Sequence, residues 1–208
     1  MKKNFRKIIK THVINNIKQY IMVSLIFVIG VFFGVIFVNN ISESQNIEVS
    51  NYVEQFVDKL KNAEEVDLIG ILKSSVLDKT ILALVVWFFG TTIVGIPVVL
   101  GIIAYRGFCL GYTIAVCIAI MGLSRGLLFV LIICFLQNIL FIPALLALAV
   151  SGLKLFSEVR KGEGKHKIKI EIIRHSLFSV IMLVALIVSG IVEVFLSTNL
   201  LLNLIKYF

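Results

Sequence analysis

Charge is scarce in this sequence, and it is missing in long continuous runs. Charged residues make up 15% of the 208 positions, whereas hydrophobic residues make up 59%. A soluble domain of this size does not need so much apolar surface, so the composition excludes a soluble globular protein. The nearly uncharged stretches that are long enough to cross a bilayer as helices are Tyr20–Val38, Ile81–Ala104, Gly107–Leu123, Gly126–Val150 and Leu177–Leu196. We therefore predict an all-α polytopic membrane helix bundle with five transmembrane helices.

Cysteines and reactive groups are scarce as well. All three cysteines (Cys109, Cys117 and Cys134) fall inside predicted spans, so no disulfide framework is available. Cys109 and Cys117 lie roughly 80° apart around a helix, which is poor geometry for a metal site. No zinc-protease motif, phosphate-binding loop or pair of intramembrane carboxylates is present, since Glu193 is the only charge inside a predicted span. We expect no metal, no cofactor and no catalytic activity.

One short motif imitates a hydrolase signature. Gly122–Gly126 matches G-x-S-x-G, but a nucleophile elbow needs its serine between a strand and a helix, with a histidine in reach. Here the motif lies between two membrane helices. All three histidines (His12, His166 and His175) are predicted on the other side of the bilayer. We therefore reject the motif as catalytic.

Acidic residues are absent before the first span, where six basic residues stand. The segment 151–176 is also basic, whereas the segment 39–80 carries eight acidic residues against four lysines. The positive-inside rule therefore places residues 1–19 and 151–176 in the cytoplasm, and residues 39–80 outside. After five crossings the C-terminal residues 197–208 also lie outside. The net charge of +8 is thus a topology signal and a lipid contact, and we expect no nucleic-acid partner.

The segments beside the spans carry weaker patterns. Residues 1–19 predict a basic amphipathic helix in the inner headgroup layer. Ala104–Arg106 predicts a short cytoplasmic turn between the second and third spans, and Pro97 predicts a kink in the second. Lys167–Ile172 alternates like a strand but has no sheet to join, so we expect an interfacial lead-in to the fifth span. Residues 197–208 predict an outer C-terminal tail.

Small residues recur at a spacing that lets membrane helices approach one another closely. Gly30 and Gly34 are four residues apart in the first span, a weak signal alone because such spacing is frequent by chance. In the third span the same spacing continues over four small residues and indicates a central, tightly packed helix. These residues are Gly107, Gly111, Ala115 and Ala119.

Three residues interrupt the otherwise apolar fourth span: Gln137, Asn138 and Pro143. An amide in lipid must find a partner because no water is there to serve it, and Pro143 leaves an upstream carbonyl without its helical donor. We interpret the two amides mainly as contacts between helices. A transport or binding role is the alternative.

The outer segment 39–80 carries two apolar stripes at helical spacing. The first comprises Val49, Val53, Phe56 and Leu60, and the second begins with Leu68 and Leu72. Asn62 followed by Glu65 resembles a capping box. Two short amphipathic helices with nothing else outside to cover them must lie on the membrane, on each other or on a partner. Lying on the membrane and docking a partner stay equally open.

Two stretches resemble the bacterial membrane family named after stage II sporulation protein M. They are Arg106–Thr113, which enters the third span, and Gln137–Ala144 in the fourth. The length, the basic N-terminal helix, the five spans and the long acidic outer loop resemble this family as well. The wider family more often has a His-Gly pair and a glutamate in the second stretch. This chain has Gln137, Asn138 and Phe141 there, which resembles the sporulation branch and weakens the idea of a membrane enzyme.

The resemblance implies a multi-pass protein of the mother-cell membrane at the sporulation septum, required for engulfment of the forespore. It also implies two partners, the sporulation proteins D and P, which remodel peptidoglycan and which the family member anchors and localises. Residues and resemblance together predict a non-catalytic scaffold in contact with membrane lipid, in which homo-oligomerisation stays open. The rival interpretation is a channel or transporter subunit that uses the polar, kinked second and fourth spans.

Overall fold

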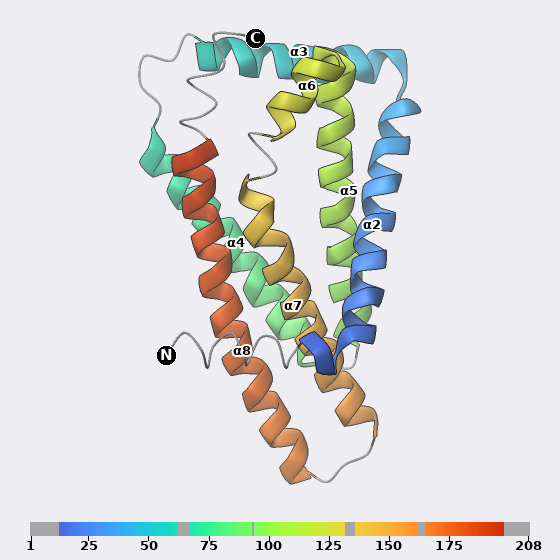
Figure 1. The fold of residues 1–208 in the computed structure, drawn as a ribbon, viewed down its shortest axis with the longest axis vertical. Helices are drawn as coiled ribbons and strands as arrows, with labels where there is room; N and C mark the ends of the chain where they lie inside the picture. The colour runs from blue at the N-terminus through green and yellow to red at the C-terminus, as the bar shows by residue number, and fades with distance from the viewer. Residues whose placement is uncertain (1–12, 62–66, 93, 132–135, 162–164, 198–208) are drawn as a thin grey trace.

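A computed structural model describes residues 13–61, 67–92, 94–131, 136–161 and 165–197. Within these ranges all regular structure is helical and no strand occurs, so the predicted polytopic helix bundle is confirmed (Figure 1). Residues 1–12 of the predicted N-terminal helix lie outside the described residues. Residues 198–208 of the predicted C-terminal tail do so as well. The elements are α2 (Ile17–Asn39), α3 (Glu43–Lys61), α4 (Leu68–Gly90), α5 (Gly95–Met121), α6 (Leu123–Val130), α7 (Leu136–Arg160), α8 (Lys165–Val192) and the short π-helical turn η2 (Glu193–Ser197).

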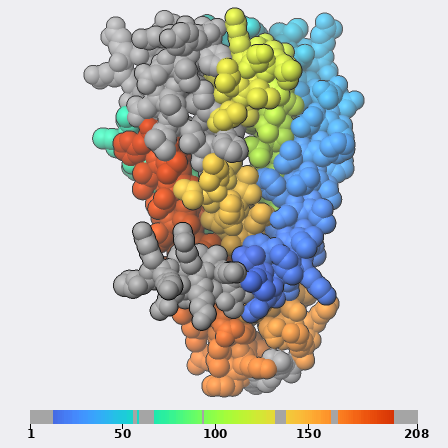
Figure 2. Space-filling view, viewed as in Figure 1, coloured from blue at the N-terminus to red at the C-terminus, as the bar shows by residue number. Residues whose placement is uncertain are grey.

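The long helices run along the length of the molecule in two groups that meet at α7. Helices α2 and α5 stand side by side, while α4, α7 and α8 pack against one another, and α3 lies across one end of the bundle (Figure 1). The hairpin of α7 and α8 projects beyond the other end (Figure 2). The core between the groups is apolar, and Val86, Ile103, Leu148 and Leu186 are completely buried in it.

Four helical stretches are long and apolar enough to cross a membrane: Ile17–Asn39, Gly95–Met121, Asn138–Arg160 and His166–Phe195. The third is the most buried of the four, which makes α7 the central helix of the bundle. Helix α4 runs alongside these helices but carries Asp78 and Lys79 in its middle, and it is not among the four. The chain is therefore a membrane protein with several apolar spanning helices.

The turn that we predicted at Ala104–Arg106 is wrong. Helix α5 runs through these residues without a break. The chain instead reverses between Gly90, where α4 ends, and Gly95, where α5 begins. The apolar run Ile81–Ala104 is thus the end of one helix and the start of the next, because hydropathy alone does not show where inside such a run a turn falls.

Local chemistry explains why the reversal falls between α4 and α5. The hydroxyls of Thr91 and Thr92 donate to the carbonyl oxygens of Phe88 (2.6 Å) and Phe89 (3.0 Å), which serves acceptors that the end of a helix leaves free. Pro97 lies in the first turn of α5, where a missing N–H breaks no helical hydrogen bond. The proline therefore starts a helix, and the predicted kink is wrong.

The described part of the basic segment after the fourth span is mostly helical. Residues 151–160 continue α7, and Lys167–Ile172 is a regular part of α8, so its strand-like alternation does not produce an extended segment. An isolated alternating segment gains nothing from an extended conformation without a neighbouring strand. As a helix it gains ion pairs, because Glu171 contacts Arg174 one turn away and Lys154 of α7 at 3.9 Å.

The second outer stripe is the beginning of α4 and not a separate helix. The side chain of Asp67 caps α4 by accepting from the backbone N–H of Gly70 at 2.9 Å. Leu68 and Leu72 therefore lie in the first turns of the long helix. The capping box predicted at Asn62 and Glu65 lies outside the described residues.

The fourth predicted span, Gly126–Val150, is described in two pieces. Gly122 ends α5 with a positive φ of 79°, a conformation that suits glycine, and α6 turns back along α5. Residues 132–135 lie outside the described residues, and α7 follows from Leu136. The structure thus describes α6 and α7 as separate helices.

Candidate functional site

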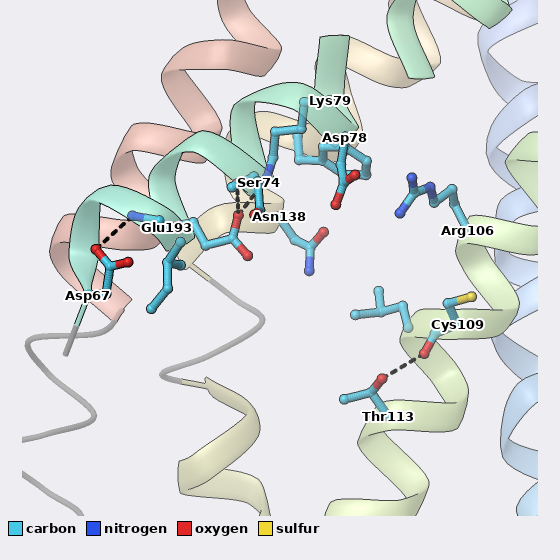
Figure 3. Close-up of a pocket in the computed structure, with 14 residues that line it drawn as sticks. Asp67, Ser74, Asp78, Lys79, Arg106, Cys109, Thr113, Asn138 and Glu193 are labelled. Carbon is cyan, nitrogen blue, oxygen red and sulfur yellow. Dashed lines mark hydrogen bonds and ion pairs between the residues drawn. The ribbon is translucent and has the colours of Figure 1, made fainter. Parts of the chain in front are cut away.

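A cavity of about 690 Å³ lies between α4, α5, α7 and η2 (Figure 3). Besides Asp67, the N-cap of α4, five residues with a charged or amide side chain line it. They are Asp78, Lys79, Arg106, Asn138 and Glu193. Ionisable groups inside a membrane bundle are costly and mark functional sites by default, so this cavity is the candidate site.

Lys79 is the most buried of the ionisable residues that line the cavity. Its side chain is almost fully buried, and its Nζ donates to the carboxylate of Glu193 and to the hydroxyl of Ser75 at 2.7 Å. The Ser75 hydroxyl in turn donates to Glu193 at 2.8 Å. Ser75 and Lys79 are four residues apart and so share a face of α4. Glu193, the only charge inside a predicted span, is thus paired with a residue of the segment 39–80.

Arg106 forms the opposite wall. It was predicted in a cytoplasmic turn, but because α5 is continuous it lies within that helix and faces the cavity. Its guanidinium carbon lies 5.6 Å from the ring centre of the buried Phe141 of α7, and Lys79 Nζ lies 5.9 Å from the same centre. Both distances fit cation–π contacts, which help to hold the two cations beside an aromatic ring.

The cavity is open on the side of α4 that precedes Lys79. Asp67, Ser74 and Asp78 line it and are exposed, whereas Lys79 is buried. The side chains of Asp78 and Arg106 lie on facing walls and point toward each other across the space (Figure 3). In the described part of the chain, neither side chain takes part in a hydrogen bond or an ion pair.

Three residues interrupt the predicted fourth span, and only one of them is seen to line this cavity. Asn138 lines the cavity. The side chain of Gln137 lies outside the described residues. Pro143 lies within α7 but is exposed on its surface, so it takes no part in the cavity.

The predicted small residues place α5, and with it Arg106, against α2. A Cβ on Gly30 or Gly34 would overlap backbone of α5, and one on Gly107 or Gly111 would overlap backbone of α2. The two glycine pairs therefore face each other at one interface, where the backbones touch. Ala115 and Ala119, farther along α5, are partly and fully exposed.

Comparison of the sequence with models of known families identifies the family of this chain. The family model described as stage II sporulation protein M matches residues 23–198, which include all four elements around the cavity. The chain belongs to this family. Searches of curated proteins and of solved structures returned no match.

In this sporulation protein M family member, a second cavity of about 440 Å³ lies between α3 and the C-terminal half of α5. Val49 and Val53 of the predicted stripe line it from α3, and Tyr112 and Val116 line it from α5. The side chains of Phe56 and Leu60 lie outside the described residues. The first stripe therefore faces the bundle but does not fill the space beneath it.

A buried histidine is a further feature that the sequence analysis did not find. His175, predicted in the cytoplasmic loop, is only 2% exposed, and its Nδ1 lies 2.8 Å from the hydroxyl of Ser151. A Cβ on Gly90 would lie 3.1 Å from its Nε2, and one on Gly152 would lie 3.0 Å from the Cα of Gly90. The histidine fills the junction where α4, α7 and α8 come together. Among the described residues, no three His, Cys, Asp or Glu side chains gather as a metal site requires.

Proposed function

We propose that this sporulation protein M family member is a membrane scaffold that anchors peptidoglycan-degrading enzymes during engulfment of the forespore. Membership of the family supports a membrane protein related to sporulation. The partners, by resemblance, are the sporulation proteins D and P, and the place of action is the mother-cell membrane at the septum. The wall chemistry belongs to these partners, and the scaffold itself is not catalytic.

The single observation that carries this proposal is the exposed helix α3 across one end of the bundle. Its Ile47 and Tyr52 are 58% and 73% exposed, and the space between α3 and α5 is incompletely filled. A helix that binds a membrane surface typically carries lysine and arginine on its polar face. Helix α3 instead carries four acidic residues and two lysines: Glu43, Glu48, Glu54, Asp58, Lys59 and Lys61. This charge favours a protein partner over an anionic lipid surface.

We further propose that α4 is a fifth crossing, which places the N-terminus in the cytoplasm and the C-terminus outside. Helix α4 runs beside the four apolar helices (Figure 1), and its central charges face the cavity between neighbouring helices, where they are sheltered from lipid. The two ends of the bundle also differ in charge. Acidic α3 lies at one end, and the basic hairpin of α7 and α8 projects from the other. The positive-inside rule places the hairpin in the cytoplasm.

Cysteine labelling tests this topology. A cysteine introduced by Ser44→Cys in α3 should react with a membrane-impermeant thiol reagent added to intact cells. The matched Lys161→Cys, at the exposed end of α7, should react only after permeabilisation. Wild-type protein gives the background of the native cysteines. The reverse pattern, or equal labelling of both sites in intact cells, would contradict the proposed orientation.

Co-purification tests the docking role of α3. The substitution Ile47→Glu places a charge on the exposed apolar part of α3, and we expect recovery of the two partner proteins from sporulating cells to fall roughly tenfold or more, as at an interface hot spot. The matched control is Val94→Glu, because Val94 is 85% exposed at the turn between α4 and α5, at the other end of α5. The control should retain both partners. Equal recovery with both variants would remove α3 from the proposed interface.

A further inference from the structure

We propose that the charged cavity between α4, α5, α7 and η2 binds a zwitterion, which presents an anionic group to Arg106 and a primary ammonium group to Asp78. This inference is independent of the scaffold proposal, since it concerns the interior of the bundle and not α3. The ligand chemistry is shared by two sources: the headgroup of phosphatidylethanolamine in the membrane and a free amino acid in water.

The zwitterion is inferred from which charged side chains of the cavity are paired and which are not. Lys79 and Glu193 neutralise each other, and Ser75 bridges them. Arg106 and Asp78 are left on facing walls, with opposite charges and no ion pair within the described ranges. A purely anionic ligand would be attracted by Arg106 but repelled by Asp78, and a purely cationic ligand would be attracted by Asp78 but repelled by Arg106. A zwitterion satisfies both.

The shape of the cavity agrees with a small ligand that enters from the side of α4. Its volume of about 690 Å³ lies within the roughly 300–1,000 Å³ that is typical of small-molecule sites. The exposed carboxylates of Asp67 and Asp78 lie at the open side, where they favour the cationic end. Arg106 lies deeper, against Phe141, and a guanidinium on an aromatic ring is well suited to hold a phosphate or carboxylate. Ile71 and Leu110 give the wall apolar surface.

A primary ammonium group is specified because Asp78 accepts hydrogen bonds and a quaternary group has none to donate. Phosphatidylcholine carries the same charges as phosphatidylethanolamine but lacks the N–H donors. Phosphatidylglycerol carries the phosphate without any cation. These two lipids therefore separate the proposed recognition from general affinity for membrane lipid.

The test uses the full chain, purified in mild detergent and titrated with one probe at a time. The probes are dioleoyl phosphatidylethanolamine, dioleoyl phosphatidylcholine, dioleoyl phosphatidylglycerol and free alanine. Binding is measured by native mass spectrometry and by the shift of the thermal unfolding midpoint. We expect saturable binding of either phosphatidylethanolamine or alanine, at least about tenfold tighter than the binding of phosphatidylcholine or phosphatidylglycerol. The latter two lipids have no ammonium N–H group that could donate a charge-assisted hydrogen bond to Asp78. Which of the two binds identifies the source.

Matched variants connect binding to the cavity. Asp78→Asn and Arg106→Gln should each weaken binding about tenfold or more. The controls Asp58→Asn in α3 and Arg125→Gln in α6 change exposed residues elsewhere and should bind as the wild type does. Ser74→Trp, a substitution at an exposed position on the open side, should block access without removing a charge, so the test does not depend on the folding of an Arg106 variant.

Three results would overturn the proposal. The first is the absence of saturable binding of both zwitterions with a primary ammonium, which would leave Asp78 and Arg106 as partners of each other. The second is equal binding of phosphatidylcholine and phosphatidylethanolamine with no binding of alanine. The third is wild-type affinity in folded Asp78→Asn and Ser74→Trp variants. None of these results bears on co-purification through α3, so the two proposals fail separately.

Discussion

Gly111→Leu is expected to lower the free energy of unfolding by about 3 kcal/mol, at the upper end of what overpacking costs. A Cβ at this position would overlap the backbone of Val31 in α2, including its carbonyl oxygen. Backbone cannot rotate away as a flexible side chain can, so the two helices must separate. Separation also breaks the neighbouring contacts of Gly30 and Gly107, which depend on the same spacing between the axes.

A second glycine of the same helix supplies the control. Gly101 is exposed on α5, and a Cβ there would meet nothing within 4 Å. Gly101→Leu should therefore be neutral or slightly stabilising, since leucine is the better helix former by somewhat under 1 kcal/mol. Both variants are compared by reversible denaturation in the same detergent. Equal stability of the two variants would show that α2 and α5 do not depend on backbone contact.

Glu193→Gln is expected to destabilise the protein by about 2 kcal/mol, less than the roughly 3–5 kcal/mol for breaking a fully buried ion pair, because the Glu193 side chain is 30% exposed. The reason is that Lys79 keeps its charge in a position that is only 8% exposed, while its counter-charge is gone. The matched control is Glu158→Gln, which breaks the ion pair with Lys161 at the surface of the hairpin of α7 and α8. Such an exposed pair contributes at most about 1 kcal/mol.

A double variant separates the cost of a lone charge from the value of the pair itself. Lys79→Met combined with Glu193→Leu removes both charges and keeps apolar volume, so we expect it to recover most of the stability lost in Glu193→Gln. Ser75 can still form a helix-backbone hydrogen bond in that background. The free energies of unfolding of the single variants Lys79→Met and Glu193→Leu and of the double variant give the coupling energy between the two side chains. Strictly additive losses would mean that the two side chains do not act as a pair.

The helices of this fold could be predicted from the long apolar runs, because such a prediction requires no information on tertiary contacts. The uncharged stretch Tyr20–Val38 differs from α2 by only a few residues at its start and one at its end. The positions of the turns were harder to predict. Pro97 is compatible with a kink inside one helix and with the first turn of another, and only the hydroxyls of Thr91 and Thr92 decide between them. A Thr-Thr pair shortly before Gly95 and Pro97 was the available signal.

The cavity escaped the sequence analysis for a related reason. Asp78 and Lys79 were counted with an outer loop and Arg106 with a cytoplasmic turn, so the charges were assigned to opposite sides of the membrane. Because the chain reverses between Gly90 and Gly95, Asp78 and Lys79 lie within α4 and Arg106 lies within α5, and all three line one cavity. The pairing of Lys79 with Glu193 joins positions 114 apart in the chain. No local pattern announces such a contact.

That long separation has a consequence for how the chain is made. Lys79 in α4 is synthesised well before its counter-charge, which follows 114 residues later in η2. A chain interrupted before Glu193 therefore keeps an uncompensated ammonium among its helices, which weakens it physically. The pair therefore forms only after η2, the last element that the structure describes, has been made.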